Sequence, residues 1–346
     1  MSFYKVSFAA GGGKTTEAER YLREHTGGLY LAFNKKVVSD LELKGFLSKT
    51  FDSLFQNYII PKCISFLPCI SKTSSIQYID DNVKQKQNIF KGVCSLSIDD
   101  DGNILYRKNK TGAKLSDSNF SIKVRFNNNQ KYFSLIHAAF GYKKTMITDE
   151  LRKGIMIFLL KKHKQKVVEL IKRRFNFVII DEAQDIKNHI ELFTKALINS
   201  DYNVILFGDS NQNINQGSTY FEELKSNEVK NESFRCSESV CSVIRKKIGI
   251  EIYGTSDHGV FRKINLEDVL SYNDGNRVLL YKAHAPYNCQ IIKEWVGESY
   301  TIQEAKGMTI CKEIVIIAKK LNKKFLYTAI TRGKSNVFST IDEPNE

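Results

Sequence analysis

The sequence lacks the cysteine patterns and long apolar runs that are typical of secreted, membrane-spanning or structural-metal proteins. Its seven cysteines include no Cys-x-x-Cys pair, and the closest two, Cys236 and Cys241, fall in a segment that we expect to be helical. An odd count without metal-ligand spacing predicts reduced thiols and an intracellular protein, cytoplasmic or nuclear. No apolar run approaches the ~20 residues needed to cross a membrane, and the N-terminal residues lack the pattern of a signal peptide. No internal repeat or low-complexity tract is evident either.

Charge, by contrast, is strongly unbalanced. The 346 residues carry a net charge of +14, and the sequence pI is near 9.3. This surplus favours a polyanionic partner such as nucleic acid, with ordinary solubility charge as the alternative. A hydrophobic fraction of 42% supports sizeable cores. The length allows two or three compact units, since domains usually hold about 100–200 residues.

The N-terminal segment carries the pattern of a phosphate-binding loop. An apolar stretch, residues 3–8, is followed at once by Ala-Gly-Gly-Gly-Lys-Thr-Thr, residues 10–16. Glycines let main-chain N–H groups close around phosphate oxygens, the next helix adds positive potential, and the lysine reaches the terminal phosphates. Alone the segment could be a simple strand-to-helix turn, because Phe8 stands where the usual pattern begins with glycine. The candidate nucleotide ligands here are Gly11, Gly12, Gly13, Lys14, Thr15 and Thr16.

A second motif follows the apolar run Phe-Val-Ile-Ile, residues 177–180, which ends in Asp181 and Glu182. Asp181 would ligate Mg²⁺ together with Thr15, leaving Glu182 to position or deprotonate an attacking water. An acidic pair alone could be a solvated strand end. In this order, each after an apolar strand, the two motifs predict an ATPase that uses ATP and Mg²⁺.

Apolar strand candidates alternate with helical patterns through most of the chain, which predicts α/β units with parallel sheets. Residues 56–149 change character and contain a hairpin signal, so we expect an accessory domain inserted into the first unit. The first unit would then hold residues 1–55 and 150–224, and the second residues 225–346. A single helix, residues 152–174, is expected to lead back from the insertion.

Eight blocks of this sequence resemble, in order, the motifs of superfamily 1 helicases, most closely the UvrD/Rep-like branch that includes F-box DNA helicases and small phage relatives. The resemblance covers nearly the whole chain except the inserted region. It implies two RecA-like P-loop domains in tandem that clamp ATP at their junction, without the large fourth (2B) domain of the bacterial enzymes. The blocks are Ala-Gly-Gly-Gly-Lys-Thr-Thr (10–16), Leu-Ala-Phe-Asn-Lys-Lys (31–36), Lys-Thr-Phe-Asp-Ser-Leu (49–54), Asp-Glu-Ala-Gln-Asp (181–185), Gly-Asp-Ser-Asn-Gln-Asn-Ile (208–214), Glu-Ser-Phe-Arg-Cys (232–236), Thr-Ile-Gln-Glu-Ala-Lys-Gly-Met-Thr (301–309) and Tyr-Thr-Ala-Ile-Thr-Arg-Gly-Lys (327–334).

The resemblance also implies roles for residues outside the two nucleotide motifs. Arg235 and Arg332 match arginines that stabilise charge on the transferring phosphoryl group. Gln212 matches the glutamine that senses the γ-phosphate, while Gln184 and Asp185 would couple that site to the second unit. An aromatic that stacks on adenine is matched by Phe234, and Gly307 falls in a block that borders the nucleotide.

Contacts with a nucleic-acid strand are implied by the same blocks. Phe33, Asn34 and Thr50 match positions in the first unit that touch single strands, by base stacking and phosphate hydrogen bonds. Thr301 and Lys306 match a backbone-tracking block of the second unit. After Gln212 the aromatic residues that relatives use to grip bases are missing, and Tyr220 or Phe221 is a guess for the replacement.

The leading hypothesis is therefore an ATP-dependent translocase that unwinds duplex DNA, with 3′→5′ polarity by analogy. An RNA helicase of the viral superfamily 1 type is the first alternative. A hydrolysis-deficient scaffold that only binds single strands is the second. The partners expected are single-stranded and duplex DNA, with proteins of replication or repair, and no membrane; a phage or viral source would fit the composition.

Overall fold

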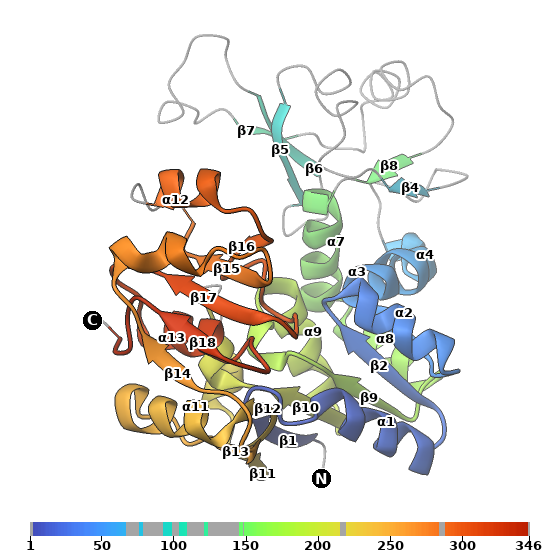
Figure 1. The fold of residues 1–346 in the computed structure, drawn as a ribbon. Helices are drawn as coiled ribbons and strands as arrows, with labels where there is room; N and C mark the ends of the chain where they lie inside the picture. Colours follow the sequence, from blue (N-terminus) through green and yellow to red (C-terminus); the bar gives the residue numbers. More distant parts are fainter. Residues whose placement is uncertain are drawn as a thin grey trace.

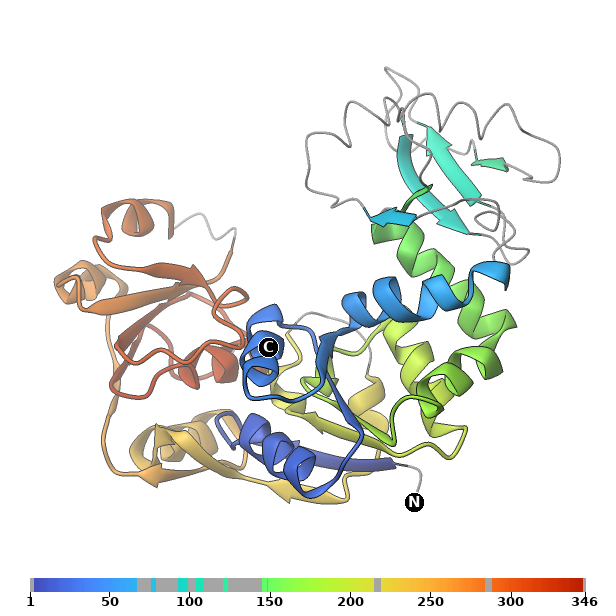
Figure 2. The ribbon, with the colours of Figure 1, turned by 90° about the vertical axis from the view of Figure 1, so that its right-hand side faces the viewer.

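The computed structural model describes residues 3–66, 76–78, 93–98, 104–108, 121–123, 145–147, 149–214, 219–283 and 288–344. Within these residues the chain forms two units, each built on a parallel sheet (Figure 1). Figure 2 shows the two units side by side, with the strands of the predicted insertion above the first. No helix of the described part is long and apolar enough to span a membrane.

The first sheet has six parallel strands. In spatial order they are β11 (Glu228–Lys230), β1 (Phe3–Phe8), β10 (Val204–Gly208), β9 (Phe177–Ile180), β2 (Gly28–Ala32) and β3 (Ser48–Thr50). Parallel strands end at one common edge, which is where such sheets bind ligands. The phosphate loop follows β1, Asp181 follows β9 and Asp209 follows β10. The topology thus gathers residues from distant parts of the chain.

Both faces of this sheet are covered at its centre, so β2, β9 and β10 are apolar and buried throughout instead of alternating with polar residues. Leu29 and Leu31 of β2 pack into one core, whereas Tyr30 and Ala32 point into the other, as the two-residue period of a strand requires. The covering helices and turns are α1 (Lys14–Glu24), α2 (Lys35–Leu43), α3 (Phe51–Leu54), η1 (Phe55–Ile59), α4 (Ile60–Lys62), η2 (Ile64–Phe66), α7 (Asp149–Lys162), α8 (Lys164–Lys172), η5 (Ala183–Asp185), α9 (Asn188–Ile198), η6 (Ser210–Gln212) and α10 (Tyr220–Glu223).

The second unit repeats the plan with a five-stranded parallel sheet. Its strands, in spatial order, are β14 (Phe261–Lys263), β18 (Val337–Ser339), β17 (Glu313–Ile317), β15 (Arg277–Tyr281) and β16 (Ser299–Thr301). Before it, β12 (Glu232–Ser237) pairs in parallel with β13 (Tyr253–Ser256). The helices and turns are α11 (Glu238–Val243), η7 (Ile244–Ile248), η8 (Leu266–Tyr272), α12 (Asn288–Glu294) and α13 (Lys323–Ile330).

Five strands are described in the predicted insertion. β5 (Val93–Ile98) pairs antiparallel with β6 (Ile104–Lys108), as the hairpin signal predicts, although the turn itself lies outside the described residues. β6 pairs with β7 (Ser121–Lys123), and β4 (Ile76–Tyr78) pairs in parallel with β8 (Thr145–Ile147).

Two details differ from the sequence predictions. The single helix predicted over residues 152–174 is two helices, because His163 leaves the helical conformation. The His163 ring packs against Phe66. Cys236 lies on strand β12 and only Cys241 is helical. Ile59 and Cys63, which follow the predicted segment 1–55, also pack into the first core, and β11, which follows residue 224, belongs to the first sheet.

Candidate nucleotide site between the two units

A cavity of about 770 Å³ lies between the two units, at the carboxyl edge of the first sheet. The whole phosphate loop lines it from one side and the second unit from the other. Seventeen of the residues that the sequence singled out line this cavity: Gly11, Gly12, Gly13, Lys14, Thr15, Thr16, Phe33, Asn34, Asp181, Glu182, Asp185, Gln212, Phe234, Arg235, Lys306, Gly307 and Arg332.

The phosphate loop is shaped by glycine. Gly11 and Gly13 have φ angles of 73° and 81°, in the left-handed region that other residues rarely adopt. A side chain at Gly11 would also come within 2.5 Å of the Arg235 Cβ atom. Gly13 caps the N-terminus of α1 without a side-chain hydrogen bond, so the first N–H groups of this helix are left to a ligand.

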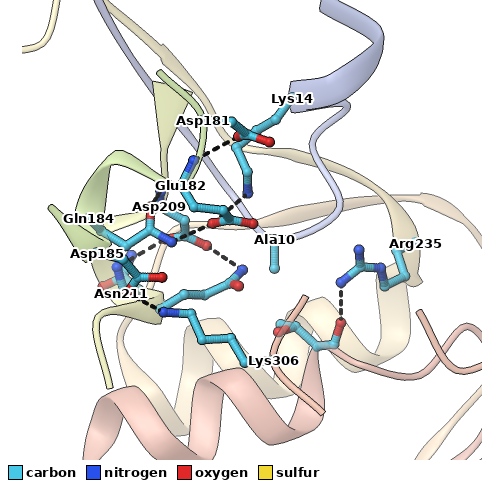
Figure 3. A network of polar contacts seen from close by, with 12 residues as sticks. Ala10, Lys14, Asp181, Glu182, Gln184, Asp185, Asp209, Asn211, Arg235 and Lys306 are labelled. Atoms are coloured by element: carbon cyan, nitrogen blue, oxygen red, sulfur yellow. Dashed lines mark hydrogen bonds and ion pairs between the residues drawn. The ribbon is translucent and has the colours of Figure 1, made fainter. Parts of the chain in front are cut away.

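Three charged groups meet at the end of β9 (Figure 3). Lys14 Nζ lies 3.7 Å from Glu182 Oε2, and the main-chain N–H of Glu182 donates to Asp181 Oδ1 at 2.8 Å. Burial and the neighbouring Glu182 raise the pKa of Asp181, against the opposing charge of Lys14. Burial alone would raise the pKa of Glu182 too, but Lys14 and a hydrogen bond from Gln184 outweigh it and lower that pKa. Glu182 is therefore held as a carboxylate.

Glu182 is also held in an unusual backbone conformation. Its φ of 51° is left-handed, one of three such values among the described non-glycine residues. A conformation of this kind costs roughly 1–3 kcal/mol and persists only where the surroundings impose it. Here the side-chain amide of Gln184 makes two hydrogen bonds. Its NH₂ group donates to the Glu182 carboxylate, and its Oε1 atom accepts from the main-chain N–H of Asp209 at 3.0 Å. The side chain of Glu182 is thus aimed into the cavity by its neighbours.

The second unit contributes two arginines. Arg332 is almost fully buried and donates to Gln212 Oε1 at 2.9 Å, which joins it to the first unit. Arg235 donates to the Thr331 carbonyl at 3.1 Å. Burial, with Arg235 close by, lowers the pKa of Arg332 to about 10, so Arg332 stays charged at neutral pH. Burial lowers the pKa of Arg235 as well. Two adjacent cations facing one cavity favour an anionic ligand.

Sequence reasoning missed Tyr30, a buried residue in the middle of β2. Its hydroxyl donates to Asp181 Oδ2 and is hydrogen-bonded to Thr15 as well. Tyr30 therefore joins the two residues predicted to ligate a metal. The available signal was a tyrosine within an otherwise apolar buried strand, because a buried phenol needs a hydrogen-bond partner.

Sequence reasoning also missed Tyr327, on α13 of the second unit. Its hydroxyl accepts from the main-chain N–H of Ala10 at 2.9 Å and donates to Asp209 Oδ2 at 3.0 Å. Gln212 Nε2 donates to the same oxygen at 2.9 Å. One buried hydroxyl of the second unit thus connects the phosphate loop with the residues that follow β10. Tyr327 opens a quoted block, but nothing local predicts its partners.

Of the residues predicted to contact a nucleic-acid strand, some line the cavity and others do not. Phe33 and Asn34 line the rim of the cavity, and Phe33 is 38% exposed. The Thr50 hydroxyl instead accepts the Ser53 N–H and caps α3, and the Thr301 hydroxyl is hydrogen-bonded to Glu304. Neither of these threonines lines the cavity.

The aromatic residues that the sequence singled out lie in different surroundings. Phe234 is 63% exposed and lies over the phosphate loop, 3.5 Å from the position of a Cβ atom on Gly13, so its ring is free to stack on a ligand. Tyr220 and Phe221 are buried in the first core and present no face to a strand. The guess that one of them replaces the missing aromatic platform is wrong.

A scan against protein-family models identifies the family. The model of the UvrD/REP helicase N-terminal domain matches residues 39–216, more than half of the chain. The chain belongs to the UvrD/REP helicase family. The match contains Asp181, Glu182 and Gln212, whereas the phosphate loop precedes it. Two parallel α/β units in tandem are the RecA-like arrangement of these helicases, and the predicted fold class is confirmed.

Three solved structures of viral helicases are similar to this chain. The crystal structure of Arterivirus nonstructural protein 10 (helicase) has 11% identity and a TM-score of 0.46, covering 98% of this chain and 59% of its own. The complex of that helicase with DNA has 12% identity and a TM-score of 0.46, covering 98% and 61%. For the PRRSV helicase the values are 11%, 0.46, 97% and 52%. This chain thus spans about three fifths or less of the length of these structures. No curated protein matches.

Proposed function

We propose that this UvrD/REP family member is an ATP-dependent translocase that unwinds DNA. One observation carries the proposal: Lys14, Asp181 and Glu182 of the first unit line the same cavity as Arg235 and Arg332 of the second. Cations from two separate units around a phosphate loop are what phosphoryl transfer requires, because its transition state spreads negative charge over the transferred group. The cavity also has room for a nucleotide.

The residues present fit Mg²⁺. Among the described residues no group of three or more His, Cys, Asp or Glu could hold a metal by itself. Mg²⁺ in such sites needs few protein ligands, because phosphates and waters complete its shell. Thr15 and Asp181 would hold it, and the Tyr30 hydroxyl keeps both side chains in place. When bound, the ion would neutralise charge on the phosphates.

The chain's own residues then divide the work. Lys14 would leave its ion pair with Glu182 for the terminal phosphates, which frees the Glu182 carboxylate. Glu182 would accept a proton from the attacking water as the water's oxygen bonds to phosphorus and the bond to the leaving diphosphate breaks. Arg235 and Arg332 would stabilise the charge that develops. Phe234 would stack on the base.

Movement along a strand would follow from closure of the cavity. Phe33, Asn34 and Thr50 on the first unit and Thr301 on the second are the proposed strand contacts. Alternate tightening of the two sets with each turnover would convert ATP hydrolysis into steps. DNA as the substrate, 3′→5′ polarity and a role in replication or repair are proposed by analogy with the family.

The test is the steady-state ATPase rate with and without oligo-dT and oligo-U, beside a Lys14→Ala control. Stimulation by oligo-dT that the control abolishes would support a DNA-dependent motor. Stimulation by oligo-U alone would replace the DNA proposal with the RNA alternative. Strand binding without ATPase under any condition would mean that the motifs serve a scaffold.

A further inference from the structure

Lys306 is placed differently from a residue that tracks a nucleic-acid backbone. Its Nζ atom lies 2.5 Å from Asp185 Oδ1, and the two side chains are only 10% and 16% exposed. Figure 3 shows the lysine reaching from the second unit to Asp185 of the first. A backbone-tracking lysine needs an ammonium group open to solvent and to phosphates. This ammonium group is instead paired and covered.

We propose that Lys306 is a positioning residue, which ties the second unit to Asp185 and through it sets the place of Glu182. The proposal rests on the proposed function, because it assigns a role in the same ATP site. It replaces the contact with a strand that the resemblance implies for Lys306.

The connection from Asp185 to Glu182 is short and stiff. Both lie in one turn, in which the main-chain N–H of Asp185 donates to the carbonyl of Glu182 at 2.8 Å. The φ of Glu182 is already left-handed, so a shift of this turn changes the direction of the carboxylate. The charge of Lys306 also acts on Glu182 directly. Asp185 is therefore a point at which the second unit can move the proposed base.

Lys306 is also close in sequence to Thr301, which is a proposed contact with the nucleic-acid strand. Residues 301–308 form a compact turn after β16, closed by the hydrogen bonds from Ala305 N–H to the Thr301 carbonyl and from Met308 N–H to the Ala305 carbonyl, both 3.0 Å long. Thr301, at the start of this turn, is a proposed strand contact. A strand that displaces Thr301 would move Lys306, and the ion pair would pass this displacement to Asp185 and Glu182.

The inference predicts a specific pattern in the variants Lys306→Met, Asp185→Asn and the double variant. Each single change should lower the strand-stimulated kcat by about tenfold, the size expected for a coupled pair of this kind. The double variant should be no worse than either single one, because both remove the same interaction. Affinity for oligo-dT should stay within a factor of about two, and Lys306→Arg should restore most of the stimulation.

Lys312→Met is the matched control. Lys312 belongs to the same unit and pairs with Glu298 at 2.9 Å, but the two side chains are half exposed and lie on one unit. This substitution should leave the stimulation unchanged.

A strand contact would give the opposite pattern. Lys306→Met would then weaken oligo-dT binding and reduce the salt dependence of that binding by about one released ion, while Asp185→Asn would not. That result overturns the proposal.

Failure of the proposed function is distinguishable from failure of this inference. If the unmodified protein shows no strand-stimulated ATPase, the proposed function fails. The role of the Lys306–Asp185 ion pair in positioning the second unit is then tested by measuring the separation of the two units. Energy transfer between dyes on unnatural amino acids at the exposed positions 43 and 296 reports that separation. An equal change in Lys306→Met and Asp185→Asn supports the tie, and no change in either overturns it.

Discussion

The Tyr327 hydroxyl of the second unit accepts a hydrogen bond from the main-chain N–H of Ala10, at the entrance of the phosphate loop, at a distance of 2.9 Å. The same hydroxyl donates to Asp209 at 3.0 Å, and the tyrosine is fully buried. A single atom of the second unit thus holds two segments of the first that border the proposed γ-phosphate position. The relationship makes the phosphate loop sensitive to the placement of the second unit.

Tyr327→Phe removes this hydroxyl and leaves a buried N–H without its partner. We expect a loss of about 1–3 kcal/mol in the free energy of unfolding, the usual cost of an unpaired buried group. The KM for ATP should rise as well, because the loop is no longer fixed. Urea unfolding and steady-state kinetics measure the two effects.

Tyr202→Phe is the control for that experiment. Its hydroxyl is also buried and donates to the Phe175 carbonyl at 2.8 Å, within the first unit and outside the lining of the cavity. The control should lose stability without a change in KM. Equal kinetics in both variants would contradict a role of Tyr327 in the nucleotide site.

Glu182→Gln tests the proposed base. The amide keeps the size of the side chain but accepts no proton, so kcat should fall by about 100-fold or more. Binding of a non-hydrolysable ATP analogue should persist, because Lys14 and the glycines remain. Unchanged turnover would show that another group takes the proton from water.

Arg332→Lys and Arg235→Lys test the two cations from the second unit. Lysine keeps the charge but loses the planar fork with which Arg332 reaches both Gln212 and the Thr328 carbonyl, the latter at 3.0 Å. We expect kcat to fall by about 1,000-fold when Arg332 is replaced by alanine, as for other arginines that stabilise phosphoryl transfer. In Arg332→Lys the charge remains, so part of the lost kcat should be restored relative to Arg332→Ala. Rapid-mixing measurements of the chemical step give the comparison. A change confined to the KM would assign these residues to binding alone.

The sequence predicts those parts of the site whose residue types are recognisable within one short segment. The phosphate loop and the Asp181 motif were predictable because each is a short segment whose residue types determine both the backbone and the chemistry. The partners of Tyr30, Tyr327 and Lys306 were not, because each depends on a residue more than 100 positions away. For Lys306 the resemblance implied a strand contact, whereas its actual neighbour is set by how the two units meet.

The extent of the first unit and of its helices also depends on distant contacts. β11 joins the first sheet through β1, with Ser7 opposite Val229, although the two segments are far apart in sequence. The helix breaks at His163, whose ring packs against Phe66, a contact that no helical pattern within residues 152–174 records. Tertiary contacts override local propensity at these places.

His189 makes the stability of the first unit depend on pH. It is 5% exposed, packs against Phe55, and neither ring nitrogen has a hydrogen-bond partner among the described residues. Burial, with a contribution from Lys153, lowers its pKa from 6.5 to about 4. The unfolded chain therefore binds a proton between these values that the folded chain does not. Stability should fall as the pH is lowered from about 6.5 to about 4, by at most about 3 kcal/mol.

Urea unfolding at several pH values, for the unmodified protein and for His189→Leu, isolates this contribution. Carboxyl groups such as Asp181, whose pKa is raised, act in the opposite direction but are common to both proteins. The difference between the two curves should therefore change only between pH 6.5 and 4, in favour of the variant as the pH falls. A difference that is constant with pH would mean that His189 is protonated in the folded protein as readily as in the unfolded chain, and that its burial costs nothing in this range.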